Sequence, residues 1–158
     1  MCEKYFYKVA ENVEDYNLLR LIPDGYKDNF YRTHGPVSFL SRPHIVENMV
    51  TLNLYTEDIP YKVTFYELNT SEPVKTYKIL NWQMICYHEE DVKEVDSFIA
   101  KRGDLWLVDL SKIHSFSSTD ESRLQKAIQL KTTEFTFDEV VKMLKITGAI
   151  HEHYSFGY

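Results

Sequence analysis

The chain has 158 residues, and its 18 lysine and arginine residues stand against 24 aspartate and glutamate residues, which gives a formal net charge of −6. This length is typical of one domain that buries most of its apolar surface on folding. An acidic chain without a basic run makes nucleic acid and a membrane surface poor candidates as partners. Hydrophobic residues make up 44%, and glycine and proline number only 5 each, which argues against a disordered or low-complexity chain.

The start of the sequence lacks the apolar core of a signal peptide, and no apolar stretch approaches the ~20 residues that cross a bilayer. We therefore expect a cytoplasmic protein. Its two cysteines, Cys2 and Cys86, are too few for a zinc site or a disulfide framework, and we expect both to be free thiols. The sequence does not distinguish a monomer from a homodimer.

Most of the chain consists of short runs rich in β-branched and aromatic residues, which predict strands. Residues 12–21 place apolar side chains on one stripe and predict an N-terminal helix that ends before Pro23. The acidic run 89–96 is typical of a solvated hairpin or loop. The predicted strands are 4–9, 37–40, 50–55, 63–68, 76–87, 105–110 and 123–130.

A second helix is predicted at the C-terminal end of the chain. Thr136 and Glu139 have the spacing of a capping box, an apolar stripe follows them, and Gly148 supplies a stop. Many short strands without alternating helices predict a mainly β fold, either a sandwich or a closed barrel. No repeat, linker or change of composition marks a second domain, so we expect a single domain over residues 1–158.

The most informative segment is 101–123. It runs from a Gly-Asp turn through an apolar strand to His114, and a polar loop over 115–122 then leads to Arg123, which opens the next predicted strand. A neutral imidazole is a suitable ligand for divalent iron, and a guanidinium is a permanently charged, forked partner for a carboxylate. A buried strand followed by these two groups predicts a functional site.

Within this region, GDLWLVDLSKIHSFSSTDESRLQKAIQL resembles the C-terminal half of the double-stranded β-helix in Fe(II)/2-oxoglutarate-dependent dioxygenases, most closely the aspartyl/asparaginyl β-hydroxylase group. Upstream, RPHIVENMVTLN at 42–53 resembles the region that carries the proximal iron ligand of that family. The resemblance covers about residues 42–130. It implies a jelly roll of the cupin type, flanked here by the N-terminal and C-terminal helices.

The resemblance also assigns roles to individual residues. It implies that His44 and His114 bind Fe(II), and that Arg123 pairs with the far carboxylate of the cosubstrate 2-oxoglutarate. Val46 occupies the position of the usual carboxylate ligand, as in the two-histidine arrangement of the β-hydroxylase group, where water fills the vacant place. Glu47 is an alternative third ligand, although strand alternation turns it away from the face of His44.

Two further residues are candidates for contacts with the cosubstrate. Thr64 and Tyr66 share one face of the predicted strand 63–68, which resembles a wall of the family's cosubstrate pocket.

Asp109 is expected to cap the turn before His114 or, alternatively, to orient that histidine through a hydrogen bond. A satisfied core histidine and a solvated arginine are the structural alternatives for the predicted ligands. Histidines expected outside the site are His34, His88, His151 and His153.

The activity implied by the resemblance is that of a dioxygenase, which converts 2-oxoglutarate to succinate and CO2 while it hydroxylates an amino acid, a peptide or a protein side chain. Because Val46 replaces the carboxylate, an alternative is a catalytically silent or metal-free module that binds a small acid or a peptide. A third alternative is a non-oxygenase cupin such as an isomerase or epimerase, which would need three or four protein ligands to its metal.

Overall fold

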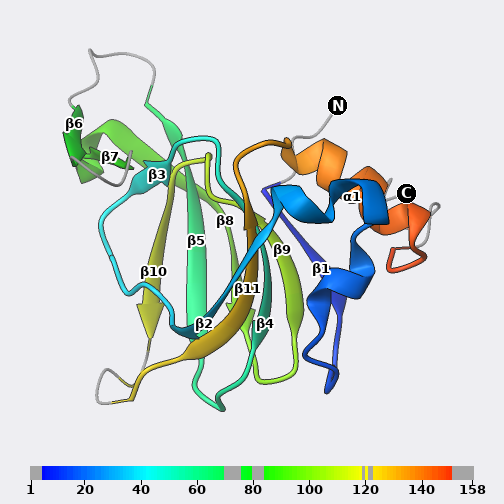
Figure 1. Ribbon diagram of the computed structural model, residues 1–158. Coiled ribbons are helices and arrows are strands. Elements are labelled where there is room, and N and C mark those ends of the chain that lie inside the picture. Colours follow the sequence, from blue (N-terminus) through cyan, green and yellow to red (C-terminus); the bar gives the residue numbers. More distant parts are fainter. Residues whose placement is uncertain (1–4, 70–75, 80–83, 119, 121–122, 151–158) are drawn as a thin grey trace.

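The computed structural model describes residues 5–69, 76–79, 84–118, 120 and 123–150. The protein is mainly β, with two antiparallel sheets and a C-terminal α-helix, as predicted (Figure 1). The five-stranded sheet contains, in spatial order, β1 (Phe6–Ala10), β9 (Leu105–Asp109), β4 (Val50–Tyr55), β11 (Lys126–Thr132) and β2 (Tyr31–Pro36). The six-stranded sheet contains β6 (Thr76–Ile79), β7 (Met84–Tyr87), β3 (His44–Val46), β10 (His114–Ser118), β5 (Tyr61–Leu68) and β8 (Val92–Ala100).

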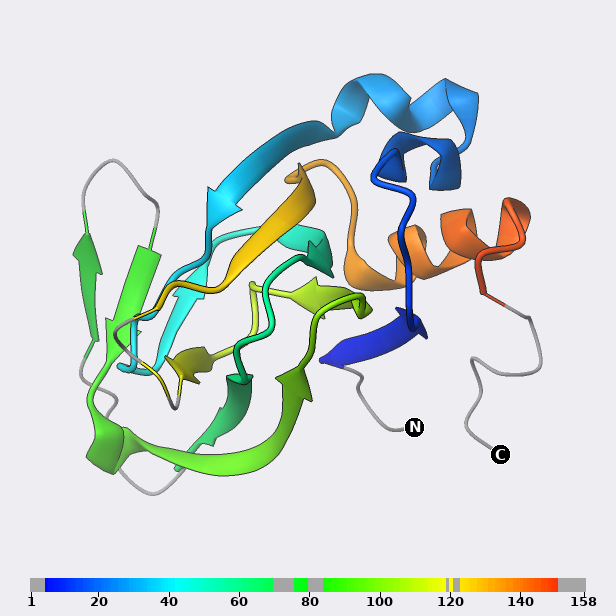
Figure 2. The ribbon, with the colours of Figure 1, turned by 90° about the horizontal axis from the view of Figure 1, so that it is seen from below.

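Both faces of the five-stranded sheet are covered. One face packs against α1 (Phe137–Ile146) and the segment that follows β1, and the other face looks toward the six-stranded sheet (Figure 2). Since side chains alternate along a strand, the central strands place an apolar face against the helix and a face of aromatic, apolar and polar residues toward the other sheet. The helix-side core includes Leu18, Leu52, Leu54, Leu107, Ile128, Leu130, Val140 and Leu144. The core between the sheets includes Tyr55, Tyr61, Val63, Phe65, Phe98, Trp106, Val108 and Phe116.

The C-terminal helix begins and ends where the sequence predicts. The Thr136 side chain accepts a hydrogen bond from the backbone N–H of Glu139, and the Glu139 carboxylate accepts one from the backbone N–H of Thr136. This reciprocal capping box satisfies two donors that a helix start otherwise leaves unpaired. Gly148 has a φ of 81°, a left-handed conformation that suits glycine after a helix end.

The predicted N-terminal helix is wrong. Within the predicted range 12–21 the structure contains only the 3₁₀ turn η1 (Leu18–Leu21), and a second 3₁₀ turn, η2 (Asp24–Asn29), follows it; the described residues contain no N-terminal α-helix. Asn12 has a φ of 54°, which no right-handed helix contains. The Asp15 carboxylate accepts a hydrogen bond from the backbone N–H of Asn17 at 3.0 Å and a second from Arg20. These local bonds offer the backbone an alternative to helix formation.

The strand predictions were correct where the sequence has an apolar pattern and wrong where the boundaries of a strand depend on pairing with other strands. Residues 50–55 form β4 as predicted, whereas the predicted strand 37–40 is irregular and the predicted strand 76–87 divides into β6 and β7, with 80–83 outside the described residues. The acidic run is not a loop, because a short 3₁₀ turn η3 (Glu89–Asp91) leads directly into β8. Cys86 is a buried free thiol, as expected, and Cys2 lies outside the described residues.

No helix in the described part of the chain combines the length and the hydropathy needed to cross a membrane.

Candidate functional site

A cavity of about 400 Å³ lies between the two sheets. The five-stranded sheet contributes mostly polar side chains to it, and the six-stranded sheet contributes the two histidines together with apolar residues. The volume is within the range of small-molecule sites. The described polar residues that line the cavity include His44, Thr51, Asn53, His114, Gln129 and Lys131.

The structure brings together the two histidines that the sequence identified as candidate ligands. His44 and His114 are directly opposite each other on the antiparallel strands β3 and β10, so their side chains share one face. Their ring centroids are 4.3 Å apart, and their residues are only 1% and 0% exposed. Residues from two distant parts of the sequence thus form one buried pair on the cavity wall.

Each histidine ring forms a hydrogen bond with the backbone carbonyl of the residue two positions before it. Nδ1 of His44 lies 2.7 Å from the carbonyl oxygen of Arg42, and Nδ1 of His114 lies 2.7 Å from that of Lys112. A carbonyl oxygen can only accept, so each Nδ1 carries the proton and each neutral ring has its lone pair on Nε2. His114 Nε2 is buried and has no hydrogen-bond partner in the described part of the protein.

The environment keeps both rings neutral. Burial lowers the pKa of His44, and burial together with the neighbouring His44 lowers the pKa of His114 to about 3. Neutral imidazoles with free Nε2 lone pairs are the form that binds a metal. A buried, unpartnered nitrogen is costly in a protein interior, and a metal ion would satisfy it.

Within the described residues, no group of three or more histidine, cysteine, aspartate and glutamate side chains is arranged to hold a metal. Val46 lines the cavity at the position where the resemblance places a carboxylate ligand. Glu47 follows β3, is only half-buried and does not line the cavity. Of the described histidine, cysteine, aspartate and glutamate side chains, only His44 and His114 line the cavity. His151 and His153 lie outside the described residues.

Arg123 is not in the cavity. The predicted strand 123–130 begins only at Lys126, and Arg123 lies in the preceding bend, where its backbone N–H donates to the Asp120 carbonyl oxygen at 3.3 Å. Its side chain is exposed. The loop after β10 takes up the residues that the prediction assigned to the start of the strand, so Arg123 stays at the surface.

Lys131 is the cation that the sequence interpretation missed. It lies on β11, on the same face as Gln129, and lines the cavity with its side chain half-buried. Burial lowers its pKa. The lining residues in the described part of the chain include no carboxylate, and no ion pair joins Lys131 to another described residue. Extending the alternation from Gln129 by two residues would have pointed to it, but the predicted strand stopped at residue 130.

Thr64 and Tyr66 are on the other face of β5. Tyr61 and Val63 line the cavity, so the alternating positions 64 and 66 face away from it. The Tyr66 hydroxyl is 2.8 Å from the Ser115 hydroxyl on the outer side of β10. The structure does not bring these two candidate cosubstrate contacts to the histidine pair.

A polar row crosses the cavity side of the five-stranded sheet. Gln129 donates from Nε2 to Asn53 Oδ1 at 2.6 Å, and Asn53 donates from Nδ2 to Thr51 Oγ1 at 2.9 Å. The row joins β11 to β4. Together with Lys131, it makes this wall hydrophilic, opposite the histidines of the other sheet.

Asp109 caps the turn before His114, as expected. Its carboxylate accepts hydrogen bonds from the backbone N–H and the hydroxyl of Ser111. The alternative bond to His114 is replaced by the carbonyl of Lys112. Asp109 therefore fixes the turn that precedes His114 at the start of β10.

No family model matches this sequence, and no curated protein matches it. Among solved structures, the crystal structure of Peruvianin-I, a cysteine peptidase from Thevetia peruviana latex, matches with 15% sequence identity and a TM-score of 0.22. The match covers 66% of this chain and 50% of the peptidase, so the chain spans about half the length of that protein. A likeness this weak carries no argument about fold or activity.

Proposed function

We propose that this protein is an Fe(II)- and 2-oxoglutarate-dependent dioxygenase that holds its metal on His44 and His114. The supporting observation is the arrangement of two neutral, buried imidazoles, 4.3 Å apart, whose Nδ1 atoms are occupied by backbone carbonyls. Metal-binding histidines commonly use the second ring nitrogen in this way, because the hydrogen bond sets the tautomer and the ring orientation.

The proposed fold is a jelly roll, and the order of the strands supports it. Of the strands, β2 to β5 and β8 to β11 form a set of eight in chain order. In the five-stranded sheet these strands have the order β2-β11-β4-β9, which are the first, eighth, third and sixth of the set. In the six-stranded sheet they have the order β3-β10-β5-β8, which are the second, seventh, fourth and fifth. This nested pairing is the one expected for a jelly roll and supports the proposed fold. β1 and the β6–β7 pair then extend the two sheets at their edges.

The donor set fits divalent iron. Imidazole nitrogen is a ligand for Fe(II), and two protein ligands leave positions for a chelating keto acid and for oxygen. When bound, iron and 2-oxoglutarate would supply the oxidising chemistry. His44 and His114 would hold the metal through Nε2, and their Nδ1 hydrogen bonds would keep the rings in position.

Lys131 is the group proposed to receive the anionic end of 2-oxoglutarate, in place of Arg123. Its ammonium shares the cavity with the histidines, whereas Arg123 is exposed outside it. An ammonium that has lost part of its hydration is stabilised by an ion pair when a carboxylate binds beside it. The amide groups of Gln129 and Asn53 line the same wall and provide further polar contacts.

The remaining walls of the cavity would orient the substrate and exclude water. Val63 and Phe116 on the six-stranded sheet and Val108 on the five-stranded sheet present apolar surface to the interior. In the balanced reaction, 2-oxoglutarate, oxygen and a substrate C–H bond give succinate, CO2 and an alcohol, with one oxygen atom going to succinate and the other to the alcohol. The chain's contribution is placement of the reactants and a dry site.

An anaerobic titration tests this function. Protein loaded with Fe(II) should bind 2-oxoglutarate with a metal-to-ligand charge-transfer absorption, and admission of oxygen should then release succinate. His114→Ala should lose the absorption while circular dichroism shows a retained fold. A protein that binds iron and 2-oxoglutarate separately, without the absorption, would contradict the proposal.

The second candidate is a metal-free module that binds a small acid. Val46, at the position of the usual carboxylate ligand, favours it, and Lys131 would serve it equally well. Calorimetry of metal-free protein distinguishes the two functions. The module should bind 2-oxoglutarate without iron and with no effect of His114→Ala, whereas the dioxygenase should require the metal for tight binding.

A further inference from the structure

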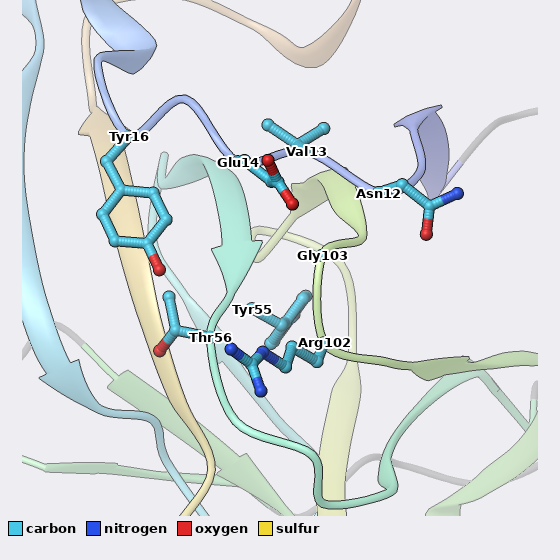
Figure 3. A pocket seen from close by; sticks show the side chains of 8 residues that line it. All are labelled: Asn12, Val13, Glu14, Tyr16, Tyr55, Thr56, Arg102 and Gly103. Atoms are coloured by element: carbon cyan, nitrogen blue, oxygen red, sulfur yellow. The ribbon is translucent and has the colours of Figure 1, made fainter.

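A second hollow, of about 490 Å³, lies where the N-terminal segment crosses the turn between β8 and β9 (Figure 3). It is separate from the histidine pair, since neither histidine lines it. Charged and hydroxyl-bearing side chains surround it, namely those of Glu14, Tyr16, Thr56 and Arg102, and Val13 adds an apolar surface.

Backbone contacts hold the walls of this hollow in place. The N–H of Val13 donates to the Gly103 carbonyl oxygen at 2.9 Å, and the N–H of Gly103 donates to the Tyr55 carbonyl oxygen at 2.9 Å. Gly103 has a φ of 86°, and a Cβ there would lie 3.3 Å from Cα of Asn12. The close approach of the two segments therefore depends on this glycine. It fixes the loop that carries Glu14 against the turn that carries Arg102.

One acidic and one basic side chain, those of Glu14 and Arg102, line the hollow and do not form an ion pair with each other. The Glu14 carboxylate points into it from the N-terminal segment, and the Arg102 side chain extends toward Thr56 on the other side (Figure 3). No ion pair joins Glu14 to Arg102, and neither side chain pairs with another residue in the described part of the chain. An anion alone would be attracted by Arg102 but repelled by Glu14, and a cation alone would meet the reverse. A molecule that carries both charges is complementary to the two groups together.

We propose that this hollow binds a zwitterionic amino acid. The ligand carboxylate would pair with the Arg102 guanidinium, whose forked donors match the two carboxylate oxygens. The ligand ammonium would pair with Glu14, and an apolar side chain would pack against Val13 and the ring of Tyr16. The site is independent of the metal site and of the proposed dioxygenase activity.

Titration of the whole chain with L-leucine, followed through backbone amide resonances, tests this site. We expect saturable shifts at Val13, Thr56 and Gly103 with a Kd of about 1–10 mM. The analogues 4-methylpentanoate, which lacks the ammonium, and 3-methylbutylamine, which lacks the carboxylate, should each bind at least about tenfold more weakly.

Charge variants complete the experiment. Arg102→Gln and Glu14→Gln should each weaken L-leucine binding by about tenfold. Arg32→Gln, which removes an exposed arginine outside the hollow, should leave it unchanged. The exchange of both charges, Glu14→Arg with Arg102→Glu, should restore binding with the ligand reversed. Absence of saturable shifts at ~50 mM L-leucine, equal binding of either analogue, or shifts confined to the histidine cavity would overturn the proposal.

Discussion

His44 and His114 face each other across β3 and β10 with their ring centroids 4.3 Å apart, and each donates its Nδ1 proton to the carbonyl two residues before it. The same local hydrogen bond on two separate strands leaves both Nε2 lone pairs available. Because each ring is oriented independently by its own backbone, the pair is organised before any ligand binds. Preorganised ligands lose little conformational entropy when a metal enters.

The first prediction concerns the dependence of metal binding on both rings. His44→Asn and His114→Asn should each reduce Fe(II) affinity by at least about 100-fold, because a single remaining imidazole cannot chelate. The double variant should be little worse than either single variant, since the two residues act as a unit. Anaerobic equilibrium dialysis measures this. His88→Asn is the control, and retention of affinity in one single variant would show that the metal is bound elsewhere.

The second prediction separates the two basic residues proposed for 2-oxoglutarate. Lys131→Met should weaken 2-oxoglutarate binding by about 10–100-fold, the range for loss of a charged hydrogen bond, with metal affinity unchanged. Arg123→Gln should alter it less than about twofold, because that side chain is exposed outside the cavity. Titration of the charge-transfer absorption measures both. A large loss in Arg123→Gln with none in Lys131→Met would return the role to Arg123.

The strands that the sequence predicted are those whose own side chains require burial. β4, for example, has six buried residues in a row and is recognisable without its neighbours. β10 is different, since its sequence HSFSS has little intrinsic preference for a strand. It is a strand because β5 pairs along its whole length and β3 pairs at its first residue. Such pairing depends on residues far away in the sequence, so a local pattern does not reveal it.

The candidate site shows the same division. The resemblance of residues 42–53 and 103–130 to a known family singled out His44 and His114, but their burial and their pairing on neighbouring strands come from the fold. Alternation along β11 places Gln129 and Lys131 on one face, but alternation alone does not tell whether that face meets solvent or a cavity. Lys131 lies inside the cavity because the six-stranded sheet covers that face of β11, and the sequence of β11 alone does not show this. The position of Arg123 depends on where a loop ends, and element boundaries are the least predictable feature of a sequence.

The third prediction concerns the turn that closes the second hollow. Gly103→Ala should lower the free energy of unfolding by about 1–3 kcal/mol, because alanine is strained at a positive φ and its Cβ would press on the Asn12 backbone. Gly25→Ala is the matched control, since no atom lies within 4 Å of a Cβ there. Urea denaturation of both variants measures the difference. Equal losses of stability in Gly103→Ala and Gly25→Ala would mean that neither the positive φ of Gly103 nor its contact with Asn12 contributes to stability.

The fourth prediction is a pH dependence that arises at Asp109. Asp109 is only 5% exposed, and burial raises the pKa of its carboxyl even though the Ser111 N–H and hydroxyl oppose the shift. The folded protein therefore binds the Asp109 proton more tightly than the unfolded chain does. The corresponding stabilisation is fully present below the unfolded pKa of about 4 and is lost as the pH rises through the raised folded value.

Asp109→Asn should remove this dependence while keeping an oxygen that accepts from Ser111. Relative to the wild type, the variant should therefore become more stable as the pH increases from about 4 to about 7, and the difference should level off once the folded carboxyl has ionised. The measurement is the free energy of unfolding in urea at several pH values. Asp58→Asn, at an exposed position, serves as the control. A difference between Asp109→Asn and the wild type that stays constant with pH would mean that Asp109 has the same pKa in the folded and unfolded states.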